Sequence, residues 1–280
     1  MTLRLADIGA RIGGVEQLGA VVNAMRGIAA ARAQQARTQL EAVDSYAATI
    51  AAAISRALTL MPTLRVGPSA ESRPALIVFT AEQGFAGAFS EHVLASLGED
   101  ITGSVLFLVG TRGASMLLER GIEPAWRAAM PSRSAGIPKL ADQISEALYA
   151  RIANGEIVKL DVVFSQWEPG HFAEVQRLGL LPLDLTHFMI PVRASPPLHN
   201  LAPADLLAGL TADYLHAQLC HAALHAFAAE NQTRMEAMAA ARDQIARQLI
   251  DLRGKERMVR QEEITAEVIE LAAGATASRS

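Results

Sequence analysis

The sequence predicts an α/β segment placed between two long helices that pair as an antiparallel coiled coil. Three observations predict this architecture. All twelve prolines of the 280-residue chain lie between Pro62 and Pro203, so both flanks lack a helix breaker. Each flank carries apolar residues at helical spacing, whereas the middle alternates short apolar runs with helix-like stretches.

The first flank, residues 1–61, is expected to form one helix. A helix over residues 4–60 would extend on the order of 80 Å at ~1.5 Å per residue, which is much longer than a typical globular helix. Its apolar residues recur at steps of three and four, namely Ile8, Ile12, Val15, Leu18, Val22, Met25, Ala29, Leu40, Val43, Ala47, Ile50, Ile54 and Leu58.

The middle segment, residues 62–203, reads as a small Rossmann-like α/β domain. Apolar runs rich in β-branched residues predict strands at residues 76–79, 105–109 and 160–164. Helix-like stretches lie between them at residues 91–97, 115–120 and 140–152. The resulting order is strand, helix, strand, two helices, strand.

The last flank, residues 204–280, is expected to be a second long helix with Asp205 as its N-cap. A seven-residue repeat runs through it and predicts a coiled coil, because an isolated surface helix has no reason to keep that register. The repeat includes Leu207, Leu210, Tyr214, Ala217, His221, Leu224, Ala228, Asn231, Met235, Met238, Arg242, Ile245, Leu249, Leu252 and Val259. Neither flank can bury its apolar stripe alone, so we expect the two to pair.

A glycine-bearing loop containing Gly84 and Gly87 follows the first predicted strand, where an α/β protein would hold a phosphate. Its residues do not fit that role. A Walker loop needs Gly-Lys-Ser/Thr and a dinucleotide fingerprint needs G-x-G-x-x-G, whereas this spacing is G-x-x-G without a lysine. The pair Gly110 and Gly113 after the second strand is equally incomplete. We expect both loops to be tight strand-to-helix turns and predict no nucleotide cofactor.

Other chemistry is weakly indicated. His216, Cys220, His221 and His225 include two i, i+4 pairs, but the pairs lie roughly 100° apart around a helix, and no metal site is predicted. The chain has no Gly-x-Ser-x-Gly nucleophile elbow. Asp161 and Glu168 lie near the third predicted strand without the features of an acid–base pair. The sequence therefore predicts a scaffold, with no catalytic residues.

Composition limits the partners and the compartment. A net charge of −4 and a pI near 6.0 argue against general nucleic-acid binding. The single cysteine, Cys220, fits a reducing compartment and hence a cytoplasmic location. No apolar run approaches the roughly 18 residues of a membrane span, so direct membrane insertion is not expected.

Four sequence blocks resemble the gamma subunit of F-type ATP synthases. They are I-G-A-R-I-G-G-V at residues 8–15, V-N-A-M-R-G-I-A-A-A-R at 22–32, A-E-N-Q-T-R-M-E-A-M at 229–238 and R-Q-E-E-I-T-A-E-V-I-E at 260–270. The loop at residues 80–90 is similar to the family's S-D-R-G-L-C-G-G-F-N. The resemblance spans nearly the whole chain.

The resemblance implies the central rotor shaft of the F1 sector, coupling ion-driven rotation of a c ring to conformational cycling of the alpha3beta3 hexamer. The implied partners are the alpha and beta subunits, the epsilon subunit and the c ring, at the cytoplasmic face of the bacterial inner membrane. Gly84 and Gly87 would form a turn in the foot domain. The implied contacts to beta subunits are Met25, Arg234, Gln261 and Thr265, and the implied bearing tip comprises Val268, Ile269, Leu271 and Ala272.

Departures from the family pattern favour a divergent branch, such as the alternate ATPases of some bacteria. The loop cysteine is replaced by Ala86, and the family's Asn-Gly-Gly after Asp243 is absent. The coupling ion, proton or sodium, is selected in the c ring and is not set by this chain. Two other functions stay open at this point: a Rossmann-like nucleotide enzyme with a coiled-coil arm, and an adaptor that tethers partners without rotation.

Overall fold

The computed structural model describes residues 5–60, 73–167, 173–184, 188 and 197–277. Its contacts divide into two compact units, residues 29–234 and residues 1–28 with 235–280. The elements in chain order are α1 (Leu5–Ala57), η1 (Leu58–Leu60), β1 (Arg73–Phe79), α2 (Phe89–Ala95), α3 (Asp100–Gly103), β2 (Val105–Val109), α4 (Thr111–Glu119), β3 (Trp126–Ala128), η2 (Ser134–Gly136), α5 (Ile137–Ala153), β4 (Ile157–Gln166), β5 (Glu174–Leu181) and α6 (Pro203–Ala277).

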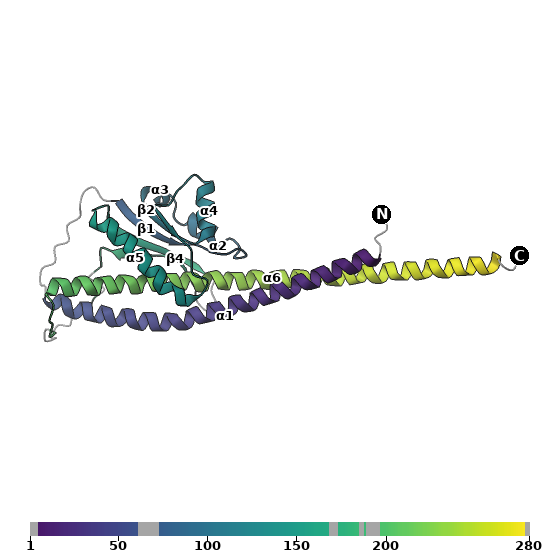
Figure 1. Ribbon diagram of the computed structural model, residues 1–280, viewed down its shortest axis with the longest axis horizontal. Helices are drawn as coiled ribbons and strands as arrows, with labels where there is room; N and C mark the ends of the chain where they lie inside the picture. Colours follow the sequence, from purple (N-terminus) through teal and green to yellow (C-terminus); the bar gives the residue numbers. More distant parts are fainter. Residues whose placement is uncertain (1–4, 61–72, 168–172, 185–187, 189–196, 278–280) are drawn as a thin grey trace. The chain divides into compact units, whose positions relative to one another are not determined.

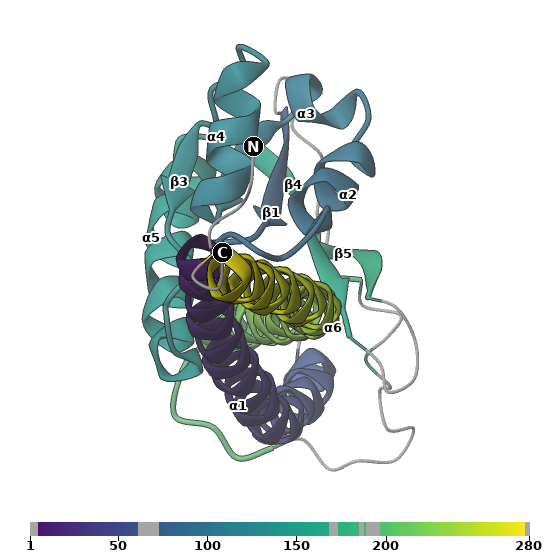
Figure 2. The same ribbon diagram turned by 90° about the vertical axis from the view of Figure 1, so that its right-hand side faces the viewer.

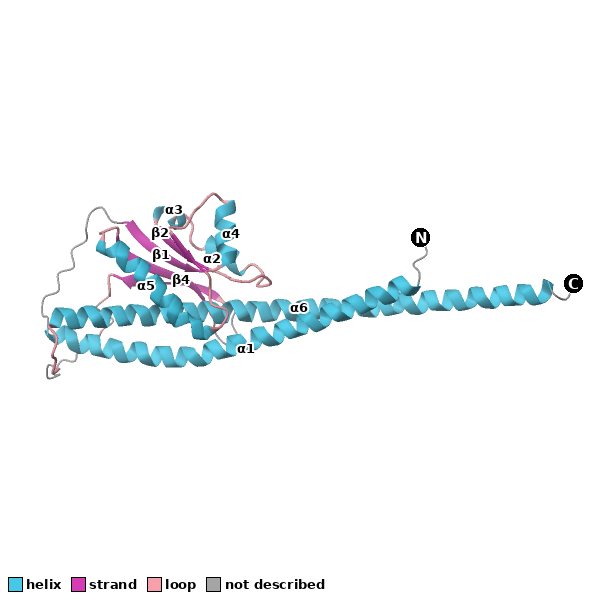
Figure 3. Cartoon of the chain, in the orientation of Figure 1, coloured by secondary structure: helices cyan, strands magenta, loops and turns pink. Residues whose placement is uncertain are grey.

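The unit of residues 29–234 is built on a five-stranded sheet with the order β3-β2-β1-β4-β5 (Figure 3). The first four strands of this order are parallel, and β5 runs antiparallel to β4. Ile77 of β1 lies opposite Phe107 of β2 on one side and Val162 of β4 on the other. Residues 75–79 of β1 are buried because helices cover both faces of the sheet, so its apolar run has no polar alternation.

Helices cover both faces of this sheet. Alternate residues of β1 point to opposite faces, so Ile77 and Phe79 belong to one buried cluster, whereas Leu76 and Val78 belong to another. The first cluster contains residues of α1, α5 and α6, and the second contains residues of α2, α3 and α4. Figures 1 and 2 show α2, α3 and α4 on the side of the sheet away from the long helices.

The long helices pair antiparallel within this unit. Arg37 Nη2 donates to Gln232 Oε1 at 2.8 Å, and His221 Nδ1 lies 2.7 Å from Asp44 Oδ1. Residue numbers that rise along α1 are therefore paired with residue numbers that fall along α6, so the helices are antiparallel. Alanines dominate the contact surface, and Ala36 is completely buried against the core. Small side chains let the two backbones approach closely.

The unit of residues 1–28 and 235–280 consists of the remaining parts of α1 and α6. Val22, Met238 and Ile245 form its buried cluster. Arg253 Nη2 and Glu16 Oε1 make an exposed ion pair at 2.7 Å, so this pairing is antiparallel too. Burial of Met238, Ile245 and Leu252 follows the seven-residue repeat.

The predicted fold class, two long helices with an inserted Rossmann-like α/β segment, is confirmed. Three details differ. Asp205 is not the N-cap, because α6 begins at Pro203, whose fixed φ and missing N–H suit a first helical position. The short elements α3 and β3 carry too few apolar residues to be predicted. Edge strand β5 was also missed, since Leu180 is its only fully buried residue.

Candidate functional site

The glycine-bearing loop leaves the carboxyl end of β1 and leads into α2. Phe85 and Gly87 both have positive φ, at 62° and 54°. The phenylalanine side chain at the loop tip is 65% exposed, whereas Ala86 beside it is buried. A non-glycine residue in the left-handed region is disfavoured, so the residues on either side must hold the loop in place.

The Glu82 carboxylate, at the start of the loop, accepts hydrogen bonds from two backbone groups of its own chain. Its Oε2 accepts hydrogen bonds from the backbone N–H groups of Thr111 at 3.1 Å and Met130 at 2.9 Å. Thr111 Oγ1 donates to the Glu82 backbone carbonyl at 2.7 Å. Because Thr111 is the first residue of α4, the carboxylate occupies the helix N-terminus at which a phosphate would bind in a nucleotide protein.

The other side of the loop is held by α6. Glu230 and Arg234 form a buried i, i+4 ion pair, with side chains 4% and 5% exposed. Arg234 Nε donates to the Gly84 carbonyl at 3.1 Å and its Nη2 donates to the Gln83 carbonyl at 3.2 Å. The remaining guanidinium nitrogen donates to Asn231 Oδ1 at 3.1 Å, and the Gln83 N–H donates to Glu230 Oε1 at 3.2 Å.

These contacts fill most of the space between the start of the loop and α6. The free volume bounded by Glu82, Met130, Phe227 and Arg234 is about 10 Å³, at most that of one water molecule. In open α/β sheets a ligand normally binds at the carboxyl ends of the strands, where the strand order reverses. In this chain α6 and the loop occupy that position.

The second glycine pair is explained by close packing. A Cβ added to Gly110 would lie 2.3 Å from the Thr80 carbonyl oxygen, and one added to Gly113 would lie 2.3 Å from Thr80 Oγ1. Glycine at both positions lets α4 approach the end of β1 directly. Gly84, by contrast, has nothing within 4 Å of an added Cβ.

The histidine and cysteine group on α6 makes polar contacts to α1 and α5, including one from His216 Nε2 to the Pro138 carbonyl oxygen at 3.4 Å. His216 Nε2 lies 3.0 Å from Asp142 Oδ1 of α5, and His221 contacts Asp44 of α1. Burial and the neighbouring His221 lower the pKa of His225 to about 4. Burial raises the pKa of the Cys220 thiol to about 12, so it is a poor metal ligand. Among the residues described, no three such side chains are grouped to hold a metal ion.

Asp161, considered above as a carboxylate near a strand, is buried in an ion-pair network. Arg177 of β5 donates to its Oδ2 through Nε at 2.9 Å and Nη2 at 2.7 Å, and also pairs with Asp100 of α3. These contacts tie the edge strand to the sheet. Glu168 lies outside the described residues.

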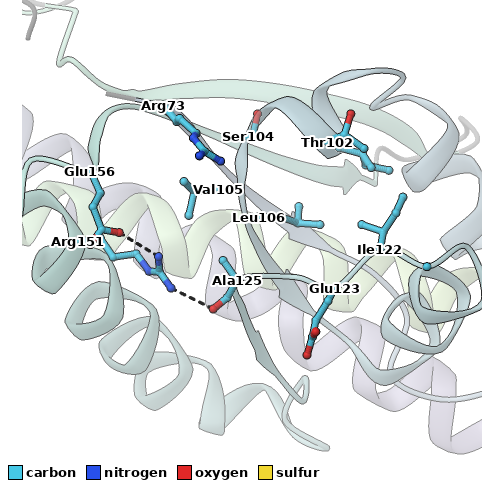
Figure 4. Close-up of a pocket in the computed structure, with 12 residues that line it drawn as sticks. Arg73, Thr102, Ser104, Val105, Leu106, Ile122, Glu123, Ala125, Arg151 and Glu156 are labelled. Carbon is cyan, nitrogen blue, oxygen red and sulfur yellow. Dashed lines mark hydrogen bonds and ion pairs between the residues drawn. The ribbon is translucent and has the colours of Figure 1, made fainter. Parts of the chain in front are cut away.

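A cavity of about 650 Å³ lies at the amino ends of β1 and β2 (Figure 4). Arg151 at its edge is paired with Glu156 at 3.1 Å and donates to the Ala125 carbonyl at 3.2 Å. Figure 4 shows Arg73 and Glu123 from other elements on the same rim. The cavity is at the opposite end of the strands from the ligand position of α/β sheets.

The residues implied as beta contacts do not share one environment. Gln261 and Thr265 are exposed one turn apart on α6, and Thr265 Oγ1 donates to the Gln261 carbonyl at 2.8 Å. Met25 is half-buried against the cluster around Val22. Arg234, however, is buried and commits its guanidinium to its own chain. The implied tip residues are exposed, namely Val268, Ile269, Leu271 and Ala272.

Sequence reasoning missed the roles of Glu82, Glu230 and Asn231. One signal was readable, because Glu230 and Arg234 are charged residues at i, i+4 within an alanine-rich helical stretch. The identity of their partners was not readable, since these partners are backbone groups of a loop some 150 residues away.

Comparisons with known proteins agree on one family. The family model described as ATP synthase matches residues 4–277. The ATP synthase gamma chain of Clavibacter sepedonicus is 26% identical, with 93% of each chain covered, and that of Frankia casuarinae is 28% identical, covering 100% of this chain and 99% of the relative.

Solved structures share the fold. A chain of the Euglena gracilis mitochondrial ATP synthase, solved as OSCP/F1/c-ring, matches with a TM-score of 0.66 at 13% identity, covering 98% of this chain and 94% of that one. A chain of the Tetrahymena thermophila mitochondrial ATP synthase central stalk and c ring gives a TM-score of 0.55 at 17% identity, covering 79% and 99%. No helix among the described residues is long and apolar enough to cross a membrane. The chain belongs to the ATP synthase gamma subunit family.

Proposed function

We propose that this chain is the central rotor shaft of a rotary ATP synthase, turning with a c ring inside an alpha3beta3 hexamer. The observation that carries the proposal is the family match over residues 4–277 together with two helices of 53 and 75 residues. A shaft must be stiff, and a long paired helix without proline supplies stiffness. The epsilon subunit and the c ring are the partners proposed for the α/β segment, which would be the foot.

The division of labour follows the predicted segments. Residues 1–61 and 204–280 would form the shaft, and residues 62–203 the foot, with Gly84 and Gly87 in its turn. Exposed apolar side chains near the end of α6 support a buried environment for this end in the complex, because such patches on isolated proteins mark interaction sites. Val268, Ile269 and Leu271 are 59%, 63% and 74% exposed.

We assign beta contacts to Gln261, Thr265 and Met25. Gln261 and Thr265 are supported by exposure of polar side chains on one helix face. A beta contact by Arg234 would require its guanidinium to leave the Glu230 carboxylate and two loop carbonyls. The chain itself would carry no catalytic site, nucleotide or metal, and would be held at the cytoplasmic face of a bacterial inner membrane through the complex.

The test is reconstitution of the alpha and beta subunits with and without this chain. We expect the full chain to change the ATP turnover of the hexamer, and a version ending at Gln261 to assemble with weaker coupling. Binding without any change in ATP turnover would support the adaptor function instead. Micromolar ATP binding by the isolated chain would favour the nucleotide enzyme, which the missing lysine and the G-x-x-G spacing of the loop disfavour.

A further inference from the structure

We propose that the buried pair Glu230 and Arg234, together with the loop backbone that it holds, is the joint that transmits torque between α6 and the sheet. We call this set, with Gln83 and Gly84, the α6 joint. The inference rests on the rotor function proposed above. It assigns Arg234 a positioning role inside the chain, where the family resemblance implies a contact to another subunit.

The charged side chains of the joint both have hydrogen-bond partners within the chain. The Arg234 guanidinium donates to two loop carbonyls and to Asn231 while paired with Glu230. The Glu230 carboxylate in turn accepts the Gln83 N–H. Asn231 Nδ2 donates to the Phe227 carbonyl at 2.8 Å, which fixes the amide. A planar guanidinium that is hydrogen-bonded on several sides resists rotation of α6 about its axis relative to the loop.

The apolar contacts beneath the sheet act together with the joint. The α6 residues in the core cluster include small side chains and also large ones, namely Ala222, Ala223, Ala226, Leu215, Leu219, Leu224 and Phe227. Hydrophobic burial is non-directional, and here it opposes separation of α6 from the sheet. The directional bonds of the joint add resistance to rotation of α6 and to a shift in its register.

Other polar links on this part of α6 reach α1 and α5, and one of them, from Arg37 of α1 to Gln232, is partly buried. His221 pairs with Asp44 of α1, and His216 pairs with Asp142 of α5. Their carboxylates are 55% and 72% exposed, so water and salt weaken these links. The Glu230–Arg234 pair of the α6 joint is buried, and its hydrogen bonds are directed to the loop that continues the central strand β1.

From the loop the connection continues into the sheet. Glu82, adjacent to the joint, accepts from the backbone N–H groups of Thr111 and Met130. The Ala81 N–H donates to Ser90 Oγ at 3.1 Å, and the Arg112 N–H donates to the Ala81 carbonyl at 3.0 Å. A twist of α6 would thus act on the beginnings of α2 and α4 and on the carboxyl ends of β1 and β3.

The experiment compares four variants, Arg234→Met, Arg234→Lys, a double variant and a control, as isolated chains and in the assembled, membrane-reconstituted complex. Arg234→Met alone leaves Glu230 unpaired and buried and is at risk of misfolding. The double variant Glu230→Met with Arg234→Met removes both charges at similar volume, which proteins often tolerate. The control is Arg151→Met, which breaks the Arg151–Glu156 pair and its bond to the Ala125 carbonyl, away from α6.

Two measurements are made on each variant. Amide hydrogen exchange on the isolated chain should be roughly tenfold faster at Gln83 in the double variant, since its acceptor is lost, and unchanged in Arg151→Met. In the complex, ions pumped per ATP against an opposing membrane potential should fall by roughly twofold or more, with the KM for ATP unchanged. Arg234→Lys should lie between, because an ammonium cannot reproduce the guanidinium fork.

The outcomes separate this inference from the proposed function. Faster exchange with a wild-type pumping ratio would show a purely structural role and overturn the joint. Unchanged exchange with an altered KM for ATP would return Arg234 to a subunit contact and overturn it as well. A wild-type chain that leaves ATP turnover of the hexamer unchanged would instead refute the rotor function, while the exchange measurement would still test the local contacts.

Discussion

Replacing Glu82 with alanine should destabilise the α/β segment through two specific hydrogen bonds. The change removes the acceptor of the Thr111 and Met130 N–H groups. Thr111 begins α4, and losing a capping acceptor costs about 0.5–2 kcal/mol. Met130 is 3% exposed, so its N–H would be left with little access to water at a cost of about 1–2 kcal/mol. The free energy of unfolding should therefore fall by about 1.5–4 kcal/mol.

For a unit of this size that loss corresponds to a decrease in Tm of about 3–16 °C. Thermal unfolding followed by circular dichroism measures the decrease, and amide exchange at Thr111 and Met130 localises it. Glu82→Gln keeps one acceptor oxygen and should lose about half as much. Glu119→Ala removes an exposed glutamate of the same helix and should change stability by less than about 0.5 kcal/mol. Wild-type Tm and exchange in Glu82→Ala would refute the assignment of this carboxylate.

Three further changes test other parts of the unit of residues 29–234. The pKa of His225 is lowered to about 4 from 6.5, so the unfolded chain takes up the proton first; stability should fall by about 1–2 kcal/mol as the pH drops from about 6.5 to about 4, a loss seen in urea unfolding and reduced in His225→Gln. Cys220, buried and with its thiol pKa raised to about 12, should react with iodoacetamide at least about a thousandfold more slowly in the folded than in the unfolded chain; rapid native labelling would contradict its burial. Ala36→Leu should cost about 1–3 kcal/mol by overfilling the contact of α1 with the core, measured by chemical denaturation against the exposed-site control Ala31→Leu, and equal costs at both sites would argue against close helix packing there.

Much of the architecture could be predicted from the sequence, because apolar patterns that extend over many residues are visible without knowledge of tertiary contacts. A proline-free flank with apolar residues at every third or fourth position has few alternatives to a helix, and the structure has helices at Leu5–Ala57 and Pro203–Ala277. Strands β1, β2 and β4 were predictable since parallel strands are buried on both faces and read as continuous apolar runs. Edge strand β5 lacks that signal, because its hydrogen bonds to β4 supply the order that its side chains do not indicate.

For the candidate site, the sequence predicted only a loop that lacks the residues of a phosphate-binding motif. The missing lysine and the wrong glycine spacing argued against a nucleotide from the sequence. What occupies the space instead depends on residues far apart along the chain, since Glu82 reaches Met130 and Arg234 reaches the carbonyls of Gln83 and Gly84. Backbone carbonyls carry no sequence signature, so no pattern could have identified these partners.

The sequence by itself therefore determined the two long helices, the inserted sheet and the family, because helical period, apolar runs and end motifs are local properties of the chain. Only the tertiary structure decided that the helix at residues 203–277 passes the carboxyl ends of the strands and places a buried ion pair there. The physical reason is that burial of a charge depends on what surrounds it in space. Arg234 reads in the sequence as a free cation for a partner, but its own chain surrounds it and supplies every acceptor it uses.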